Sequence, residues 1–460
     1  MGNWRIFTTV MLGLISLGAA GRLSADGGEG VSAKEMAELR AMLEAQQQII
    51  GELKNEVTTL RGELKTVREG YVAMDAPTNP SAEAIANEQL LVPKAEPVVD
   101  PALSFKHKDW RFEVYGFVKA DIAYDTHRVF NGDFVRYVYP EEPNSDSQLS
   151  LTARETRLGL KIHGPEWDGW TPGARVETDF YGNYSSSTPV LRMRLAYAEM
   201  TDGTWTVRAG QDWDAITVAL PRTVNCGSFA YQGALWSRRP LLKGIYEGEV
   251  GPGNLKVTGA IAAAVSGDID GGGTPDGKDS GIPNTELAIA YDIDLAKDLT
   301  LTTAVSGMYG QEAFDKAGVG EVDYDAYVGM FTGILDWKGH AKLLGAIWSG
   351  TDLGSFNGGV GQTVNLAKGT TVDAWGGWVQ LQTFPWEDLN WNIGFGYDDP
   401  NDADLSAGMR RFNSTATTSV YYKLTPYLTI AGEYSYLMTG YQGSSTADSQ
   451  RIQGSVIVEF

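Results

Sequence analysis

A two-residue alternation of apolar and charged side chains is the feature that most constrains this chain. In residues 110–124, "WRFEVYGFVKADIAY", the even-numbered residues are apolar or glycine, whereas the odd-numbered residues include four charges. Successive side chains of a β-strand point to opposite faces of a sheet, so this stretch predicts a strand with one apolar and one charged face. The pattern recurs between Gly, Asp, Asn and Pro turns up to the last residue. Residues 110–460 therefore predict an antiparallel β protein.

A soluble sandwich and a membrane barrel both accommodate this alternation in any single strand. The number and length of the strands favour the barrel. We count about 17 candidate strands of roughly ten residues, the length that a tilted strand needs to cross the hydrocarbon layer. Residues 228–238 are the weakest candidate, and omitting them leaves about 16, an even number as in single-chain bacterial barrels. We therefore predict an all-β fold, a 16-stranded antiparallel transmembrane barrel over residues 105–460.

Loop lengths and aromatic residues agree with a barrel in an outer membrane. Short turns such as "TDGT" alternate with long loops such as "DTHRVFNGDFVRYVYPEEPNSDS", an asymmetry typical of outer-membrane barrels. The last strand, "GSVIVEF", should close the sheet against the first one, with Phe460 in its lipid-facing row. Aromatic residues at strand ends should form belts at the membrane surfaces; they are Trp205, Trp213, Trp337, Trp348, Trp386, Trp391, Tyr427 and Tyr441.

The first 20 residues have the composition of a cleaved secretory signal. Arg5 precedes an apolar stretch over residues 10–17, and small residues follow at 18–20. The formal net charge of −21 makes nucleic acid an unsuitable partner. The single cysteine, Cys226, excludes an intramolecular disulfide, and the four histidines lack the spacing of a metal site on one helix, so we expect no cofactor and no metal.

A heptad repeat precedes the barrel, and residues 31–74 are predicted to form an α-helical coiled coil in the periplasm. Glu56 and Glu63 at g positions face Arg61 and Arg68 at the following e positions, the arrangement of a parallel oligomer. The a and d residues favour a dimer mildly. Five prolines then mark residues 75–104 as an extended linker. The predicted oligomerisation seam includes Leu39, Leu43, Ile50, Leu53, Val57, Leu60 and Leu64.

The chain resembles the DcaP-like outer-membrane porins. The resemblance rests on the signal, the coiled coil, the linker and the stretches "VYGFVKADIAYD", "ARETRLGLKIHGP", "GARVETDFYG", "LRMRLAYAEM" and "VRAGQDWD". It is specific over residues 110–214 and follows strand rhythm alone afterwards. The resemblance implies a trimer of 16-stranded barrels in the outer membrane of a Gram-negative-type cell, with small anionic solutes such as dicarboxylates passing through. A C-terminal aromatic such as Phe460 also resembles the signal that the outer-membrane assembly machinery recognises.

The charged faces of the first five strands supply the candidate residues of the lumen wall. Guanidinium groups stay charged and bind carboxylate or phosphate oxygens in a bidentate fork, so an arginine surplus would favour anions. Alternatively, each arginine pairs with a neighbouring carboxylate and only braces the wall. The predicted lumen residues are Arg111, Arg157, Arg175, Arg192, Arg194 and Arg208 with Glu113, Glu177 and Asp179, whereas Leu191, Met193, Leu195 and Tyr197 are assigned to the lipid face.

Two connections carry further hypotheses. Residues 215–240, with Arg222, Arg238 and Arg239, are long enough to fold into the lumen, but they could also form an outer loop. The aspartate-rich loop "GDIDGGGTPDGKDSGIPN" lacks the closing glutamate of an EF-hand, so we expect a solvated turn.

Three functions remain open at this point. The first is a diffusion porin, and the second is a structural protein whose barrel anchors the coiled coil as a spacer or cell-wall tether. The third is a barrel enzyme, which we do not expect because no nucleophile, base and acid stand together.

Overall fold

The structure is a computed structural model. It describes residues 103–141, 147–182, 188–264, 266–267, 269–270, 274–316 and 320–460. The predicted signal, the coiled coil with its seam residues, and nearly all of the linker lie outside the described residues. No helix in the described part is both long and apolar enough to cross a membrane.

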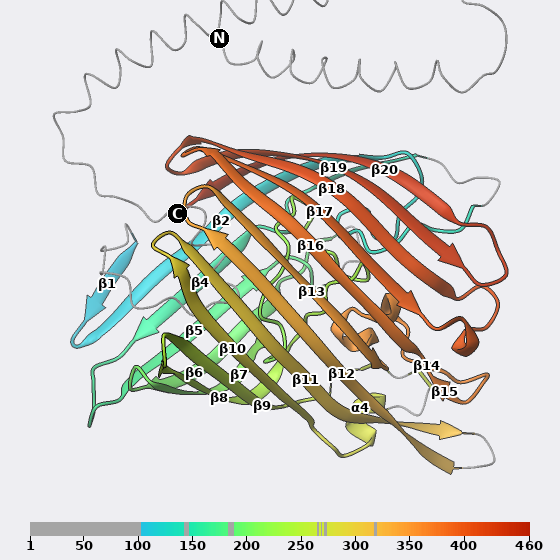
Figure 1. Cartoon of the computed structure of the whole chain (residues 1–460), viewed down its shortest axis with the longest axis horizontal. Helices are drawn as coiled ribbons and strands as arrows, with labels where there is room; N and C mark the ends of the chain where they lie inside the picture. The colour runs from blue at the N-terminus through green and yellow to red at the C-terminus, as the bar shows by residue number, and fades with distance from the viewer. Residues whose placement is uncertain are drawn as a thin grey trace, which may run out of the picture. The chain divides into compact units, whose positions relative to one another are not determined.

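Antiparallel strands hydrogen-bond to their neighbours around a closed wall (Figure 1). The sheet contains 18 strands, of which β1 (Ser104–His107) is a short addition to the start of β2, and β3 and β4 are two parts of one wall strand. The wall therefore has 16 strands, and the predicted count is confirmed. They are β2 (Trp110–Asp125), β3 (Gln148–Thr152) with β4 (Arg157–His163), β5 (Thr171–Asp179), β6 (Arg192–Thr201), β7 (Trp205–Trp213), β8 (Arg238–Val250), β9 (Gly253–Ala262), β10 (Asn284–Ala296), β11 (Leu299–Lys316), β12 (Gly320–Trp337), β13 (Ala341–Thr351), β16 (Asp373–Trp386), β17 (Leu389–Pro400), β18 (Arg410–Thr425), β19 (Leu428–Tyr441) and β20 (Ala447–Glu459).

The last strand closes the wall against the first, as the sequence predicts. Residues 451–459 of β20 pair with residues 117–125 of β2, and the blue and red strands lie side by side in Figure 1. Phe460 continues this pairing because its amide donates to the carbonyl of Gly116 at 3.0 Å and its carbonyl accepts from the Gly116 amide at 3.0 Å. Its ring is exposed in the outward row that includes Val456 and Val458. The final residue therefore completes the seam of the barrel.

The outer surface of the wall is apolar. On β17, Trp391, Ile393 and Phe395 are exposed, whereas Asn390 and Asn392 between them are buried on the inner face. The same arrangement recurs on the other long strands, so large aliphatic and aromatic side chains cover the exterior all around. Such a continuous apolar surface is unsuited to water and suited to the hydrocarbon of a bilayer.

The predicted aromatic belts are only partly correct. Trp205, Trp337, Trp386, Trp391 and Tyr427 are exposed, and all five lie at the end of the wall that carries the short turns. The other three residues are wrong as belt residues, because their side chains point inward and pack in the core; they are Trp213, Trp348 and Tyr441. Inward aromatics fill the lumen where connections fold into it.

A β-bulge on β6 corrects the predicted lipid face of this strand. Glu177 of β5 pairs with Leu195 and Thr178 pairs with Met193, so Arg194 is an extra residue. An extra residue reverses the alternation beyond it. Leu195 and Tyr197 were expected to face lipid, but Leu195 is buried in the core and Tyr197 lies against Arg208 inside the lumen.

Residues 214–237, here called the lumen loop, connect β7 to β8 and cross the inside of the barrel (Figure 1, green). The loop is fastened to distant strands. The carbonyl of Ile216 accepts from Ser306, the amide of Val224 donates to Glu433 at 2.7 Å, and the indole of Trp348 donates to the Gly233 carbonyl at 2.8 Å. This segment was expected either to fold into the lumen or to form an outer loop, and in the structure it lies in the lumen.

The doubtful candidate strand at 228–238 belongs mostly to this loop. Ser228, Phe229 and Tyr231 have φ angles of 44°, 59° and 63°, in the left-handed region that no strand adopts. Only its last residue, Arg238, is in a strand. The even number of wall strands follows from this.

Other connections also contain short elements, and one of them packs against the lumen loop. The carbonyls of Phe356 and Asn357, at the end of the 3₁₀ turn η2 (Gly354–Phe356), accept from the amides of Trp236 and Tyr231. The remaining short elements are α4 (Asp276–Asp279), η3 (Gly359–Gly361), β14 (Val364–Asn365), β15 (Thr370–Thr371) and η4 (Asp402–Asp404).

Candidate functional site: the arginine wall and the cavity beside it

Glu177 and Asp179 occupy the inner face of β5, two residues apart on the same strand. The neighbouring strands are β4 on one side and β6 on the other, and they bring Arg157, Arg192 and Arg194 to this pair of carboxylates. The bulge at Arg194 lets both β6 arginines reach them. These three consecutive strands and the start of β8 form a cluster that we call the arginine wall, which comprises Arg157, Arg175, Arg192, Arg194, Arg238, Glu177 and Asp179.

Ion pairs hold the arginine wall together. Glu177 accepts from Arg194 Nε at 2.6 Å and from Arg175 Nη2 at 3.1 Å, while Arg157 Nε lies 3.6 Å away. Asp179 accepts two bonds from Arg192, at 2.9 and 2.5 Å, and a third from Arg194 at 3.1 Å. Each carboxylate therefore serves more than one guanidinium group.

Arginines outnumber carboxylates in this cluster. Arg238, at the start of β8, adds a fifth guanidinium, which lies over the rings of Trp213 and Trp236 at 4.9 and 5.5 Å. Its Nη1 atom is buried without a hydrogen-bond partner among the described residues. Cation–π contact stabilises a guanidinium without neutralising its charge. The arginine wall therefore carries a positive excess.

A second group of charges borders the wall and reduces this excess. Lys119 of β2 forms ion pairs with Glu155 and, at 3.5 Å, with Asp121. With these residues counted, six cations face four carboxylates, so two positive charges remain uncompensated. Within the arginine wall, Arg192 and Arg175 are the most accessible of the arginines that form ion pairs, with side chains 25% and 16% exposed. These two present the excess to water.

The remaining predicted arginines are neutralised. Arg111 pairs with Glu113 at 2.9 Å near the short-turn end of the barrel. Arg208 pairs with Glu199 at 2.7 Å and with Asp212 at 2.7 Å, over the ring of Tyr197. The alternative that arginines only brace the barrel thus describes these two positions, whereas the arginine wall, which includes Arg238 of β8, keeps its surplus.

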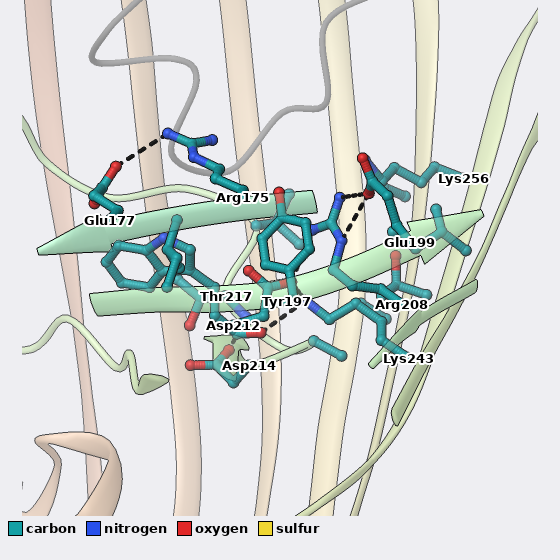
Figure 2. A pocket seen from close by; sticks show the side chains of 18 of the residues that line it. Arg175, Glu177, Tyr197, Glu199, Arg208, Asp212, Asp214, Thr217, Lys243 and Lys256 are labelled. Carbon is teal, nitrogen blue, oxygen red and sulfur yellow. Dashed lines mark hydrogen bonds and ion pairs between the residues drawn. The ribbon is translucent and has the colours of Figure 1, made fainter. Parts of the chain in front are cut away.

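A cavity of about 300 Å³ lies beside the arginine wall, and Figure 2 shows its charged lining. Arg175 and Glu177 are at one side, and Arg208 with Glu199 is at the other. Lys243 donates to Asp212 at 2.8 Å between them. Its cationic residues are Lys161, Arg175, Arg208, Lys243 and Lys256, and its acidic residues are Glu177, Glu199, Asp212, Asp214 and Asp292. This compartment is polar but balanced in charge, unlike the arginine wall.

Sequence reasoning missed the aromatic partners of the arginines. Tyr115 accepts from Arg175 Nε at 2.6 Å and donates to Glu177 at 2.9 Å, so its hydroxyl bridges the two. Its position among the charged residues of the first strand signals an inward side chain. Trp213 and Trp236 carry no such signal, because their inward orientation depends on the lumen loop.

Two features of the described residues bear on metal binding and nucleophilic catalysis. Among them, no group of three or more His, Cys, Asp or Glu side chains is arranged to hold a metal ion. Burial raises the pKa of the Cys226 thiol in the lumen loop to about 12, so it is protonated and a poor nucleophile.

Comparisons with solved structures place the fold among outer-membrane channels. The outer membrane channel DcaP of Acinetobacter baumannii superimposes with a TM-score of 0.61 and 18% identity, covering 78% of this chain and all of the other. The anion-selective porin from Comamonas acidovorans shares the barrel too, with a TM-score of 0.51 and 13% identity over 76% of this chain and 100% of that chain. Salmonella typhi OmpF also superimposes with a TM-score of 0.51, at 12% identity over 78% of this chain and 100% of that chain. No protein-family model matches the chain, and no characterised protein matches it in sequence. The predicted likeness to the DcaP fold is thus confirmed.

Proposed function

We propose that this protein is a porin of the outer membrane, through which small polar solutes diffuse passively, with a preference for anions. The observation that carries the proposal is the uncompensated positive charge of the arginine wall, next to a lumen loop that narrows the barrel. Guanidinium groups attract carboxylates and hold them through paired N–H donors. Solutes with two carboxylates, spaced to reach two arginines, fit this wall best.

The surrounding charges do not remove the preference. The chain carries −21 overall, but at about 0.15 M salt the Debye length is near 8 Å. Acidic loops farther away are therefore screened, while Arg192 and Arg175 act directly on an ion that passes the wall. The local excess, and not the net charge of the protein, sets the selectivity.

A matched pair of substitutions at one position tests the proposal. Arg192→Gln removes an accessible positive charge and Arg192→Lys keeps it, while both alter the bidentate pair with Asp179. In planar bilayers under a salt gradient, the parent should be anion-selective, the Gln variant less so, and the Lys variant close to the parent. The difference should be largest at low salt, where screening is weakest. Cation selectivity in the parent, or equal selectivity in both variants, would refute the anion preference.

We also infer that the barrel assembles as a trimer whose coiled coil, residues 31–74, extends into the periplasm, where the assembly machinery engages Phe460. The heptad seam and its g-to-e charge pairs support an oligomer, and the resemblance of the sequence to the DcaP-like porins implies three copies. Deleting residues 31–75 should weaken the oligomer and leave the barrel folded, because the wall closes through β2 and β20 alone. Analytical ultracentrifugation in detergent measures both species, and an unfolded truncated chain would contradict the inference.

A further inference from the structure

Buried carboxylates gather on the inner side of β10, β11 and β13, away from the arginine wall. Asp276, Glu286, Glu312 and Asp352 are each at most 4% exposed. Arg239 of β8 interacts electrostatically with Glu286 and Glu312; it stacks on Phe356 at 3.8 Å and donates to Ser237 at 2.8 Å. Among the described residues this side of the lumen is therefore rich in negative charge and poor in cations.

Two of these carboxylates accept hydrogen bonds from backbone amides. Glu286 accepts from the amide of Ala215 at 2.6 Å, and Asp276 accepts from the amide of Ile269 at 3.0 Å. Asp276 was expected to lie in a solvated turn. Instead it begins α4, which packs on β11 and is buried. These two side chains thus serve to fasten connections to the wall.

Glu312 and Asp352 differ from them. They lie within hydrogen-bonding distance of each other. Nevertheless Oε2 of Glu312 and both carboxylate oxygens of Asp352 are buried without any donor in the described part of the chain. Burying one ionised carboxylate without a partner is costly, and two side by side cannot both stay ionised unless a positive charge joins them.

The backbone at Asp352 is also unusual. Asp352 follows the end of β13 with a φ angle of 55°, a left-handed conformation that costs energy for a residue with a Cβ. Strain and an unsatisfied carboxylate at one residue together indicate that a missing group binds there.

We propose that Glu312 and Asp352 bind a calcium ion. Ca²⁺ prefers carboxylate oxygens, accepts them in bidentate mode, and tolerates irregular coordination completed by main-chain carbonyls and water. Two side chains suffice for such a site, so it does not need the group of three that the described residues lack. One divalent cation supplies the two positive charges that this pair is short of.

A calcium ion at this site would stabilise the connection that follows β13. Asp352 opens the connection that continues through η2, where the side chain of Asn357 donates to the Trp236 carbonyl at 2.7 Å. The amide of Trp236 donates back to Phe356 at 3.0 Å. A calcium ion between β11 and Asp352 would therefore fix the connection that holds the lumen loop.

The full-length protein in detergent, stripped of divalent ions with EGTA, provides the test. Calorimetric titration with CaCl₂ should show a saturable site, and Ca²⁺ at 100 times the measured Kd should raise the unfolding temperature by several degrees. Mg²⁺ at equal concentration should have a smaller effect, because it requires stricter octahedral geometry. Binding is measured without any current, so a negative result here leaves the proposed porin function untouched.

Substitutions assign the site. Asp352→Asn and Glu312→Gln should each abolish the calcium-dependent shift, whereas Asp323→Asn, an exposed acid on the neighbouring strand β12, should keep it. If the parent shows no saturable binding, the two carboxylates share a proton instead and the inference fails. It also fails if Asp352→Asn folds and still binds calcium with the parent's affinity. Should either site variant not fold, the other and the parent titration decide.

Discussion

The arginine wall and the Glu312–Asp352 pair are two buried clusters in one barrel that each carry an excess of one charge, and the excess is accommodated differently in each. In the wall, each carboxylate is shared by several arginines, and the surplus Arg238 lies on tryptophan rings. In the acidic pair, three carboxylate oxygens have no donor among the described residues. A guanidinium cannot release its proton in a protein, but a carboxylate can take one up or bind a cation. The positive field is therefore permanent, and the negative one depends on what is bound.

The largest effect should come from removing the carboxylate that the arginines share. Glu177→Gln leaves Arg157, Arg175 and Arg194 without their common counter-charge, and breaking a buried pair in this way costs ~3–5 kcal/mol. Urea unfolding in detergent measures the loss. Glu113→Gln is the control, because its pair with Arg111 is more exposed and should cost less than ~1 kcal/mol. Equal losses in the two variants would show that the wall is not a network.

Removing one charge from the acidic pair should stabilise the protein, whereas removing Glu177 should destabilise it. In EGTA, Asp352→Asn is expected to raise the free energy of unfolding by ~1–3 kcal/mol, because the amide removes one buried charge and donates to Glu312. The same urea titration provides the measurement. A less stable Asn variant in calcium-free buffer would mean that the ionised Asp352 has a partner outside the described residues.

The pH dependence should distinguish the two clusters. Burial, followed by the nearby Glu312 and Asp276, holds the pKa of Asp352 well above its usual range. The folded protein then binds this proton more tightly than the unfolded chain, so stability falls as the pH rises from about 4, the ordinary aspartate value, through the raised pKa. One such group contributes a slope of at most ~1.4 kcal/mol per pH unit. Unfolding midpoints between pH 5 and 9 in EGTA should show this slope, and either calcium or Asp352→Asn should flatten it.

The last prediction is that the ion selectivity set by the arginine wall does not change with pH. Because guanidinium groups do not titrate below pH 12, the reversal potential in a salt gradient should stay constant between pH 5 and 9. This is measured on the parent in bilayers with calcium present, so that the acidic pair stays occupied. A selectivity that changes within this range would assign it to other ionisable groups of the lumen rather than to the arginine wall.

Much of the candidate site could be predicted because alternation is a local property. Whether a strand residue faces the lumen or the lipid follows from its odd or even position along the strand. Arg157, Arg175 and Arg192 were therefore assigned to the lumen from the sequence. Glu177, Asp179 and Arg194 were assigned to the lumen in the same way, but the residues that follow Arg194 were not. Arg194 is the extra residue of a bulge, and Leu195 and Tyr197 beyond it turn inward against the predicted pattern. A bulge depends on the pairing of two strands, which no single segment encodes.

The sequence by itself determined the strands, their number, the apolar exterior and the closure through the last strand, because these follow from a period of two repeated along the chain. The tertiary structure alone decided what fills the lumen. The lumen loop lies inside because Glu433, Trp348 and other residues far along the chain bind its backbone. Glu312 and Asp352 are 40 residues apart and meet only because β11 and the connection after β13 come together in the closed wall. Contacts of this kind join residues whose local sequences carry no sign of each other.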